Sequence, residues 1–532
     1  MDDVDVLIIG AGASAAAFAW SIADTRMHIV CLEQGDWVDH KNLPATGKDW
    51  QSRRDFGGDP NVRKLDADYP INCRDSDIAA SNYNGVGGGT ILYAAHFPRF
   101  HPSDFKVRTL DGVADDWPID YAGLEPYYAI NDKMMGVSGL TGDPAYPPKQ
   151  PLMPPLPLGK SSAALARGYN ELGWHWWPSD CAINTEVYEG RDRCINLGTC
   201  GVGCPQGAKA SVDVTYWPVA VRAGVKLKTR CRVREITIGP DGMATGAIYY
   251  DADGNEQQIN ASMVVVACNG IGTPRLLLNS KSSLFPDGLA NSSGLVGKNL
   301  MFHPYAGVDG VFDEELDGNK GPHKGLSCHE FYETDASRGF VRGFSFEMHR
   351  GYGPITSAVL GMTTGNIPWG KAHHEAYREI ADHTMTIVAV CEDLPQEQNE
   401  VVLDPELCDS DGIPAAKVHY RMSDNSKKML QFALERGREA MEAAGARQIL
   451  REVGPIRNAG WHNMGTARMG TDPSTSVTNE WGRCHDVKNL FIIDGSLFVT
   501  GAAINPTSTI QALALCVADT VKNKLYDASL FE

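Results

Sequence analysis

The stretch VDVLIIGAGASAAA, residues 4–17, decides the fold class of this chain. Its first six residues form a short, continuous apolar run, which is typical of a strand buried on both faces. Gly10 and Gly12 follow where a tight turn and a close backbone approach are needed, and Ala15 lets the next helix pack on the strand. A second apolar run, HIVCL at 28–32, completes a β-α-β unit. Such a unit implies a parallel sheet with helices on both faces.

The turn between this strand and helix has the features of a dinucleotide-binding site. Free N–H groups at the helix N-terminus can bind a pyrophosphate. Glu33, at the end of the second strand, can accept hydrogen bonds from ribose hydroxyls. A tight turn without a ligand is the alternative, but the strand, the helix and the acid occur together here. The expected cofactor contacts at this end are Gly10, Gly12, Ala13, Ser14, Ala15 and Glu33.

The other end of the chain returns to the same pattern. Residues 490–493 (LFII) predict a buried strand, residues 494–496 a turn, and residues 508–524 a helix. A nicotinamide enzyme usually completes its site inside one contiguous lobe. A site built from both ends of the chain therefore fits the longer FAD molecule better.

The composition limits the classes of protein to which the chain can belong. It has 532 residues, 66 acidic against 48 basic side chains, a net charge of −18 and 43% hydrophobic residues, which is typical of a globular protein. The acidic excess argues against binding to nucleic acid or to anionic lipid. No apolar run is long enough to cross a membrane, and residues 4–9 do not form a signal peptide. We therefore expect a cytoplasmic protein, with export beside a signal-bearing partner as the alternative.

Several short motifs follow one another along nearly the whole chain. They are GAGASA at 10–15, GGGT at 87–90, WPI at 117–119, LEPYY at 124–128, GTPRLLL at 272–278, GKNL at 297–300, HNMGT at 462–466 and NPT at 505–507. In this order they resemble the motifs of the glucose-methanol-choline (GMC) oxidoreductases, which are FAD-dependent. Within that family the chain looks most like the gluconate, fructose and glucose dehydrogenase large subunits and the related sugar or aryl-alcohol oxidases.

The resemblance implies an α/β (α+β) fold of two domains. A discontinuous Rossmann-like FAD-binding domain would comprise residues 1–155, 205–310 and 454–532. A sheet-based substrate-binding domain would comprise residues 156–204 and 311–453. The residues themselves predict a helix at 426–444, hairpin strands at 225–238 and 243–250, and a turn at 269–274.

The resemblance also implies a catalytic pair. In the family, the first histidine of an H-x-x-G-T motif handles the substrate hydroxyl proton, which gives that role to His462. The residue before the proline of the last motif is Asn505, whose amide can hydrogen-bond the substrate oxygen without competing for its proton. An imidazole titrates near neutrality and can accept the proton while hydride leaves the carbon. We expect the other histidines, including His96 and His303, to be packing or rim residues.

Further FAD contacts are implied in the middle and at the end of the chain. The Gly-rich segment would pass along the flavin and pyrophosphate, and the helix after Pro506 would direct its positive end at the flavin pyrimidine. Some relatives attach FAD covalently through a histidine at the position of Tyr93, so a tyrosine there predicts non-covalent FAD. The contacts are Gly87, Gly88, Gly89, Thr90, the backbone of Val233 against adenine, Asp494, Gly495, Asn505, Pro506 and Thr507.

Three cysteines lie close together in the Gly-rich stretch RCINLGTCGVGCPQG at 193–207. Cys194, Cys200 and Cys204 have the spacing found around a three-iron (3Fe-4S) cluster in the large subunits of some sugar dehydrogenases. Reduced structural thiols, one disulfide, or zinc with a fourth ligand are the alternatives. A cluster would carry electrons outward to a partner and would indicate a dehydrogenase.

These observations predict FAD-dependent oxidation of an alcohol to a carbonyl, by hydride transfer to flavin N5 with His462 as proton acceptor. The substrate would be a sugar or glycoside hydroxyl or an aryl alcohol, and the flavin would be reoxidised by oxygen or by an electron-transfer partner. The alternatives are a lyase of the hydroxynitrile type and the large subunit of a membrane-linked dehydrogenase with a small subunit. A redox-silent binding subunit is disfavoured by the His462/Asn505 pair. A homo-oligomer is compatible with the sequence.

Overall fold

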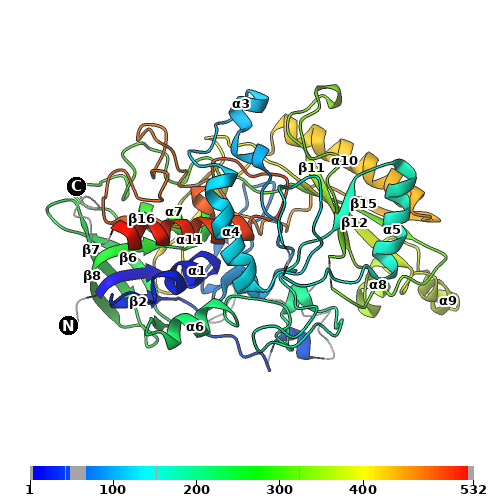
Figure 1. Cartoon of the computed structure of the whole chain (residues 1–532), viewed down its shortest axis with the longest axis horizontal. Coiled ribbons are helices and arrows are strands. Elements are labelled where there is room, and N and C mark those ends of the chain that lie inside the picture. The colour runs from blue at the N-terminus through cyan, green and yellow to red at the C-terminus, as the bar shows by residue number, and fades with distance from the viewer. Residues whose placement is uncertain (1–3, 42, 48–66, 151, 323, 525–532) are drawn as a thin grey trace.

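The chain forms two lobes side by side, each built on its own sheet (Figure 1). The computed structural model describes residues 4–41, 43–47, 67–150, 152–322 and 324–524. Both ends of the described chain lie in the same lobe, where the first helix and the last helix pack together (Figure 1). We call this lobe the parallel-sheet lobe and the other the antiparallel-sheet lobe.

The parallel-sheet lobe has the strand order of a doubly wound nucleotide-binding fold. Its five parallel strands lie in the order β5-β2-β1-β8-β16, which is third, second, first, fourth and fifth along the chain. The N-terminal part of β8 also pairs antiparallel with β7, and β7 with β6. The strands are β1 (Val4–Ile9), β2 (Ile29–Leu32), β5 (Lys226–Lys228), β6 (Arg232–Ile238), β7 (Ala244–Tyr250), β8 (Glu256–Val266) and β16 (Leu490–Ile492).

The antiparallel-sheet lobe is a six-stranded sheet covered on one face by two helices, α5 (Gly159–Leu172) and α10 (Asp424–Ala443). Alternate side chains of the sheet, such as Phe344, Phe346 and Met348, pack in one buried cluster with α5 and α10. The strands are, in spatial order, β15 (Gln448–Val453), β9 (Tyr305–Val311), β12 (Thr384–Cys391), β11 (Phe344–His349), β10 (Leu326–Cys328) and β4 (Trp176–Pro178). A third, small sheet contains β13 (Glu400–Cys408), β14 (Pro414–His419) and β3 (Ile71–Asn72).

The remaining elements connect these sheets or cover them. On the parallel-sheet lobe, α1 (Ala13–Ile22) packs against α11 (Thr507–Lys524), which also contacts α4 (Tyr121–Met135). The other helices are α3 (Val107–Asp111), α6 (Tyr216–Arg222), α7 (Asn269–Asn279), α8 (Pro354–Thr363) and α9 (His373–Arg378). The 3-10 turns are η1 (Pro44–Thr46), η3 (Gly88–Ile91), η4 (Pro102–Phe105), η5 (Cys200–Val202), η6 (Ala336–Arg338) and η7 (Gly495–Leu497).

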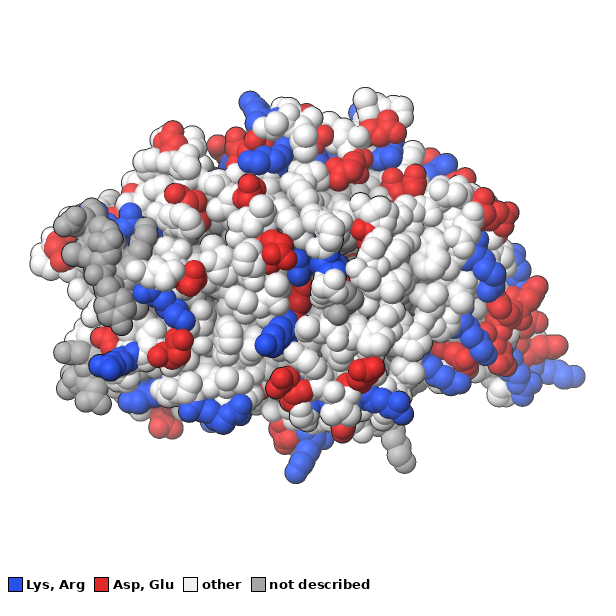
Figure 2. Space-filling view, in the orientation of Figure 1, with Lys and Arg blue, Asp and Glu red and all other residues white. Residues whose placement is uncertain are grey.

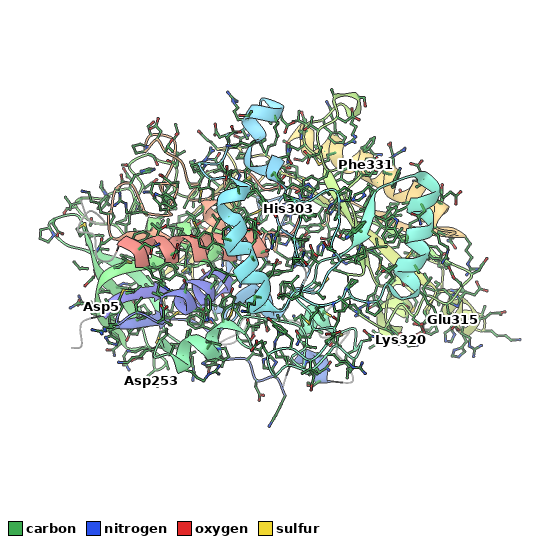
Figure 3. All side chains as sticks on the ribbon, viewed as in Figure 1. Asp5, Asp253, His303, Glu315, Lys320 and Phe331 are labelled. Atoms are coloured by element: carbon green, nitrogen blue, oxygen red, sulfur yellow. The ribbon has the colours of Figure 1, made fainter. Side chains whose placement is uncertain are left out.

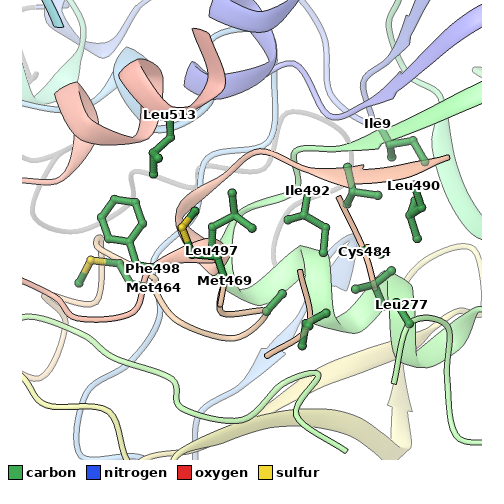
Figure 4. Packing of buried hydrophobic residues seen from close by; sticks show 14 of the residues in the cluster. Ile9, Leu277, Met464, Met469, Cys484, Leu490, Ile492, Leu497, Phe498 and Leu513 are labelled. Carbon is green, nitrogen blue, oxygen red and sulfur yellow. The ribbon is translucent and has the colours of Figure 1, made fainter. Parts of the chain in front are cut away.

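The two ends of the sequence share one hydrophobic core (Figure 4). Ile9 of β1 belongs to the same buried cluster as Leu490 and Ile492 of β16, Phe498 and Leu513. Burial of such apolar side chains contributes roughly 1.5–3 kcal/mol each. The last part of the chain is therefore an integral layer of the N-terminal fold.

The predicted fold class, α/β with a Rossmann-like domain and a second sheet domain, is confirmed. The predicted helices at 426–444 and 508–524 correspond to α10 and α11, and the predicted hairpin contains β6 and β7. The domain boundaries stay a prediction, and β9, which begins at Tyr305, already belongs to the antiparallel sheet. No helix in the described part of the chain is long and apolar enough to cross a membrane.

The turn predicted at residues 269–274 is wrong, because this segment begins α7. Pro274 lies inside the helix and cannot donate to the carbonyl of Gly270, which is four residues earlier. That carbonyl instead accepts a hydrogen bond of 2.8 Å from Thr466 Oγ1. A distant side chain therefore replaces the missing helix bond, which the local sequence does not show.

The surface carries charge unevenly on the face shown in Figure 2. Acidic and basic side chains gather most densely at the end of the antiparallel-sheet lobe, where α9 lies, and are more scattered in the middle of this face. Among the described residues on this face, charges of both signs are interspersed, and they form no basic stripe of the kind that binds nucleic acid.

Candidate active site

The turn after β1 leaves open space beside one of its glycines. Gly10 has a φ of +95°, and a Cβ added there would lie 2.6 Å from the carbonyl oxygen of Ala267. A Cβ added to Gly12 would have no neighbour within 4 Å. Gly10 is therefore required by the fold itself, whereas Gly12 leaves room for a ligand.

The Gly-rich segment 87–90 lies directly against this turn. Gly87 N donates to Ala11 O at 2.9 Å, and a Cβ added to Gly88 would lie 3.0 Å from Gly12 Cα. A Cβ added to Gly89 would have no neighbour within 4 Å. Two segments that are distant in sequence thus form one surface of bare backbone, which fits a pyrophosphate bound by N–H groups.

Glu33 lies where the sequence predicts the ribose contact. Its carboxylate accepts hydrogen bonds from Ala11 N and Gly35 N, both at 2.8 Å. Burial raises the pKa of this carboxyl group, and the backbone N–H donors counteract the rise. Cys231 N donates to Glu33 O at 2.8 Å, which brings the strand that contains Val233 to the same edge of the sheet.

The C-terminal segments meet the N-terminal turn at this edge. Gly465 N, in the HNMGT motif, donates to Gly495 O at 3.1 Å. Asp494 accepts from Thr273 Oγ1 at 2.6 Å and from Asn269 N at 3.0 Å, so it holds the start of α7. Pro506 directly precedes α11, which begins at Thr507, and Gln511 Nε2 of this helix donates to Ala13 O at 3.4 Å.

His462 contacts a second histidine. Its Nδ1 lies 2.7 Å from His303 Nδ1 and 3.3 Å from the hydroxyl of Tyr305. The other ring nitrogen of His303, Nε2, lies 2.9 Å from Ala502 O and 3.1 Å from Gly501 O. Burial lowers the pKa of His303 to about 4 and the pKa of His462 well below its ordinary value. His303 lies in the middle of the molecule, between the two lobes (Figure 3).

Asn505 is also held by a histidine. Its Oδ1 lies 2.7 Å from Nδ1 of His96, and the same Nδ1 lies 2.8 Å from Oε1 of Glu347 on β11. Gly501 and Ala502, which bind His303, are in the loop that ends at Asn505. The structure therefore brings the two residues of the predicted catalytic pair into one neighbourhood between the lobes.

Models of one enzyme family match most of the chain. The N-terminal and C-terminal models of the GMC oxidoreductases match residues 4–305 and 395–514. This chain belongs to the GMC oxidoreductase family. It is an FAD-dependent oxidoreductase of the class that acts on CH–OH groups.

Several curated and solved proteins are similar to this GMC oxidoreductase over nearly their whole lengths. The 2-methyl-1,2-propanediol dehydrogenase of Mycolicibacterium austroafricanum is 42% identical, over 99% of this chain and 96% of the relative. The fructose dehydrogenase large subunit of Gluconobacter japonicus is 29% identical, over 98% of each chain. The pyridoxine 4-oxidase of Mesorbium loti has the same fold, with a TM-score of 0.70 at 17% identity, over 98% of this chain and 99% of that chain.

Two histidines of this GMC oxidoreductase do more than the sequence predicted. His303 and His96 are buried, as packing residues would be, but they contact His462 and Asn505. Each lies far in sequence from the residue that it contacts, and neither belongs to a motif. Only a contact map, and no local pattern, could have identified them.

The predicted 3Fe-4S cluster is not supported. The part of the chain that the structure describes contains no group of three or more His, Cys, Asp or Glu side chains that could hold a metal ion. Cys194 Sγ instead accepts from Asn196 N at 3.4 Å within a local turn. Cys200 O accepts from the buried ammonium of Lys209, which fixes this loop to the Gly-rich segment. The spacing of the three cysteines alone was therefore not sufficient to predict a cluster.

Proposed function

We propose that this GMC oxidoreductase oxidises an alcohol to a carbonyl, with His462 as the acceptor of the hydroxyl proton and Asn505 as a hydrogen-bond donor to the substrate oxygen. The observation that carries the proposal is the pairing of His462 with His303. This pairing determines which nitrogen of His462 has a free lone pair.

The partners of His303 fix its tautomer. Its Nε2 faces two carbonyl oxygens, which can only accept, so Nε2 carries a hydrogen. A neutral imidazole with a hydrogen on Nε2 has its lone pair on Nδ1. That lone pair needs a donor, so His462 carries its hydrogen on Nδ1 and leaves Nε2 as the base. The lowered pKa values keep both rings neutral before substrate arrives.

The residues around the turn fit FAD. The backbone of Gly12 and Gly89 would approach the pyrophosphate, Glu33 would accept from the ribose, and the N-terminus of α11 would face the flavin ring. When bound, FAD supplies an acceptor that takes a hydride from the substrate carbon at N5. Tyr93 donates its hydroxyl to Ala210 O at 2.6 Å, which supports non-covalent binding.

We propose a substrate with adjacent hydroxyl groups, such as an aliphatic diol or a sugar, in preference to an aryl alcohol. The names of the 2-methyl-1,2-propanediol and fructose dehydrogenases indicate such substrates for those relatives. Reoxidation would use oxygen or an electron-transfer partner.

Anaerobic bleaching of the bound flavin tests this proposal. The purified protein is mixed without oxygen with 2-methyl-1,2-propanediol, fructose, gluconate and benzyl alcohol. We expect the yellow colour to disappear with at least one diol or sugar. Bleaching by benzyl alcohol alone would contradict the substrate class. A yellow protein that no alcohol bleaches, but that cleaves a hydroxynitrile, would indicate the lyase instead.

Acid precipitation tests how the cofactor is held. We expect trichloroacetic acid to release yellow flavin into the supernatant. Position 93 is a tyrosine, so the chain lacks a histidine nitrogen there that could bond covalently to the flavin. A pellet that stays yellow would contradict non-covalent binding.

A further inference from the structure

A cluster of buried polar side chains contacts Asn505 through His96 and has no part in the proposed transfer of a proton and a hydride. His96, Lys324 and Glu347 are 3%, 3% and 1% exposed. Lys324 forms an ion pair with Glu347 and also contacts His349. Burying an ion pair removes the hydration of two charges, and this cost can cancel the attraction between them. A contribution to folding stability is therefore a weak explanation for the Lys324–Glu347 pair, and a role at the site is the alternative.

The hydrogen bonds of His96 restrict the orientation of the Asn505 amide. Nδ1 of His96 faces both Glu347 Oε1, at 2.8 Å, and Asn505 Oδ1, at 2.7 Å. A carboxylate can only accept, so Nδ1 carries a hydrogen, and the Asn505 atom facing it must also be an acceptor. The amide oxygen therefore points at His96, and the NH2 group points away from it.

Further contacts hold His96 in this state. Burial would raise the pKa of Glu347, but Lys324 and His96 outweigh burial and keep the pKa well below its ordinary value, so the carboxylate stays charged. On the other side of the ring, His96 Nε2 lies 3.1 Å from the hydroxyl of Ser327, which can donate to it. Glu347 thus requires a hydrogen on Nδ1 of His96, and the Ser327 hydroxyl at Nε2 is compatible with that tautomer.

We propose that His96 is a positioning residue that sets the amide orientation of Asn505, and that Glu347 and Lys324 fix His96 for this task. The amide then presents N–H, and not C=O, to the oxygen of the substrate. Without His96 the amide can turn by half a rotation and present its oxygen, which repels the negative charge that develops on the substrate oxygen. The inference rests on the proposed function, because it needs Asn505 to meet the substrate.

A double-mutant cycle tests the inference on the FAD-loaded enzyme. The limiting rate of anaerobic flavin bleaching and the substrate concentration at half-saturation are measured for His96→Ala, Asn505→Ala and the double variant. We expect His96→Ala to lower the limiting rate at least tenfold with a smaller effect on half-saturation. If His96 acts through Asn505, the double variant is no slower than Asn505→Ala. If instead the double variant is slower than Asn505→Ala by the same factor that His96→Ala costs alone, the two residues act independently and the inference is overturned.

Two amide variants provide a test that does not depend on alanine at this buried position. An asparagine nitrogen can occupy the place of His96 Nδ1, whereas the longer glutamine places its amide near Nε2. We expect His96→Asn to recover most of the rate and His96→Gln to recover little. Equal rates for the two variants would overturn the inference.

A control variant and the wild type distinguish a failure of the proposed function from a failure of the inference about His96. His383 is a partly buried histidine whose Nδ1 lies 3.1 Å from Phe312 O, outside the site. His383→Ala combined with Asn505→Ala is expected to give multiplicative effects. If no alcohol bleaches the wild type, the proposed function and this inference both fail. If the wild type bleaches and the His96 cycle is multiplicative, only the inference fails.

Discussion

In the proposed mechanism, His462 obtains its role as a base from neighbours that are remote in sequence. His303 determines which nitrogen of His462 is free, and the carbonyl groups of residues 501 and 502 determine the tautomer of His303. Ala502 has a φ of +59°, an unfavourable conformation for a residue with a side chain. The loop before Asn505 is thus held in a strained shape in which two carbonyls converge on one imidazole.

The pH dependence of flavin reduction follows from these contacts. Burial and His303 lower the pKa of His462 below its ordinary value of 6.5, so the base is already neutral at pH 6.5. We expect the limiting rate of anaerobic bleaching to be constant from about pH 6.5 upward and to fall only in more acidic solution. Stopped-flow measurements across this range provide the check. A step centred between about pH 6.5 and 8 would contradict the lowered pKa.

The motif HNMGT predicts His462, and the motif NPT predicts Asn505, because each motif is local. The same sequence could not predict which atom of either residue faces the substrate. In the proposed mechanism that orientation depends on His303 and His96, which contact His462 and Asn505 from other segments of the chain. The chemistry proposed for each residue therefore rests on contacts that no single segment contains.

At the scale of elements, the two glycines of the first turn make a matched pair of tests. In Gly12→Ala the new Cβ meets no atom, and the φ of −77° suits alanine, so we expect apo-protein stability within about 1 kcal/mol of the wild type. The same methyl group would occupy the expected pyrophosphate position, so FAD affinity should fall at least about tenfold. Denaturant unfolding of the apo-protein and FAD titration measure the two effects.

Gly10→Ala is the contrasting variant. Its Cβ would meet a carbonyl oxygen at 2.6 Å in a left-handed conformation, so we expect a loss of about 2 kcal/mol or more in folding stability itself. If both variants bind FAD as tightly as the wild type, the turn is not the cofactor site.

The loop that contains the three cysteines depends on Lys209. Its buried ammonium donates to the carbonyls of Ile91, Tyr93 and Cys200 at 2.7–2.9 Å. Lys209→Met would leave three carbonyls without this donor, so we expect a loss of about 2 kcal/mol in unfolding free energy and faster release of FAD. Lys320→Met, at a largely exposed ion pair, is the control, with an expected change below about 0.5 kcal/mol. Equal stability of the two variants would show that Lys209 does not hold this loop.

Elements with strong local patterns were predictable, and elements defined by distant partners were not. The β1–α1–β2 unit, α10 and α11 follow from apolar periodicity and turn residues. The helix α7 was missed because its proline is compensated by Thr466, nearly two hundred residues later. The short helices α8 and α9 and the order of the antiparallel strands were also not predicted, since pairing between remote strands leaves no local signal.

At the scale of the whole molecule, a buried neutral histidine makes the unfolding free energy fall as the pH falls. The pKa of His303 is about 4 in the folded protein and near 6.5 in an unfolded chain, so the unfolded state binds the proton first. Its contribution is complete above about pH 6.5 and is lost as the pH falls toward 4, by up to about 3 kcal/mol. We expect His303→Gln to show a shallower loss of unfolding free energy between pH 7 and pH 5 than the wild type.

The comparison between these two proteins is needed because other groups oppose the trend. Burial raises the pKa of Asp393 to about 7, so this carboxyl group favours the folded state as the pH falls. That effect is common to the wild type and the variant and cancels in the difference. Identical pH dependence in both proteins would contradict a neutral, buried His303.

We propose that the chain as a whole builds one site from its two ends and from a second sheet. β1 and β16 flank the same strand, and Tyr305 of β9 and Glu347 of β11 contact the predicted catalytic neighbourhood from the antiparallel sheet. The most direct test of this account is the limiting rate of anaerobic flavin bleaching in His462→Ala, at full FAD occupancy and with the best alcohol from the panel. We predict a rate about 10²–10⁴-fold below that of the wild type. A variant that bleaches at the wild-type rate would contradict His462 as the proton acceptor.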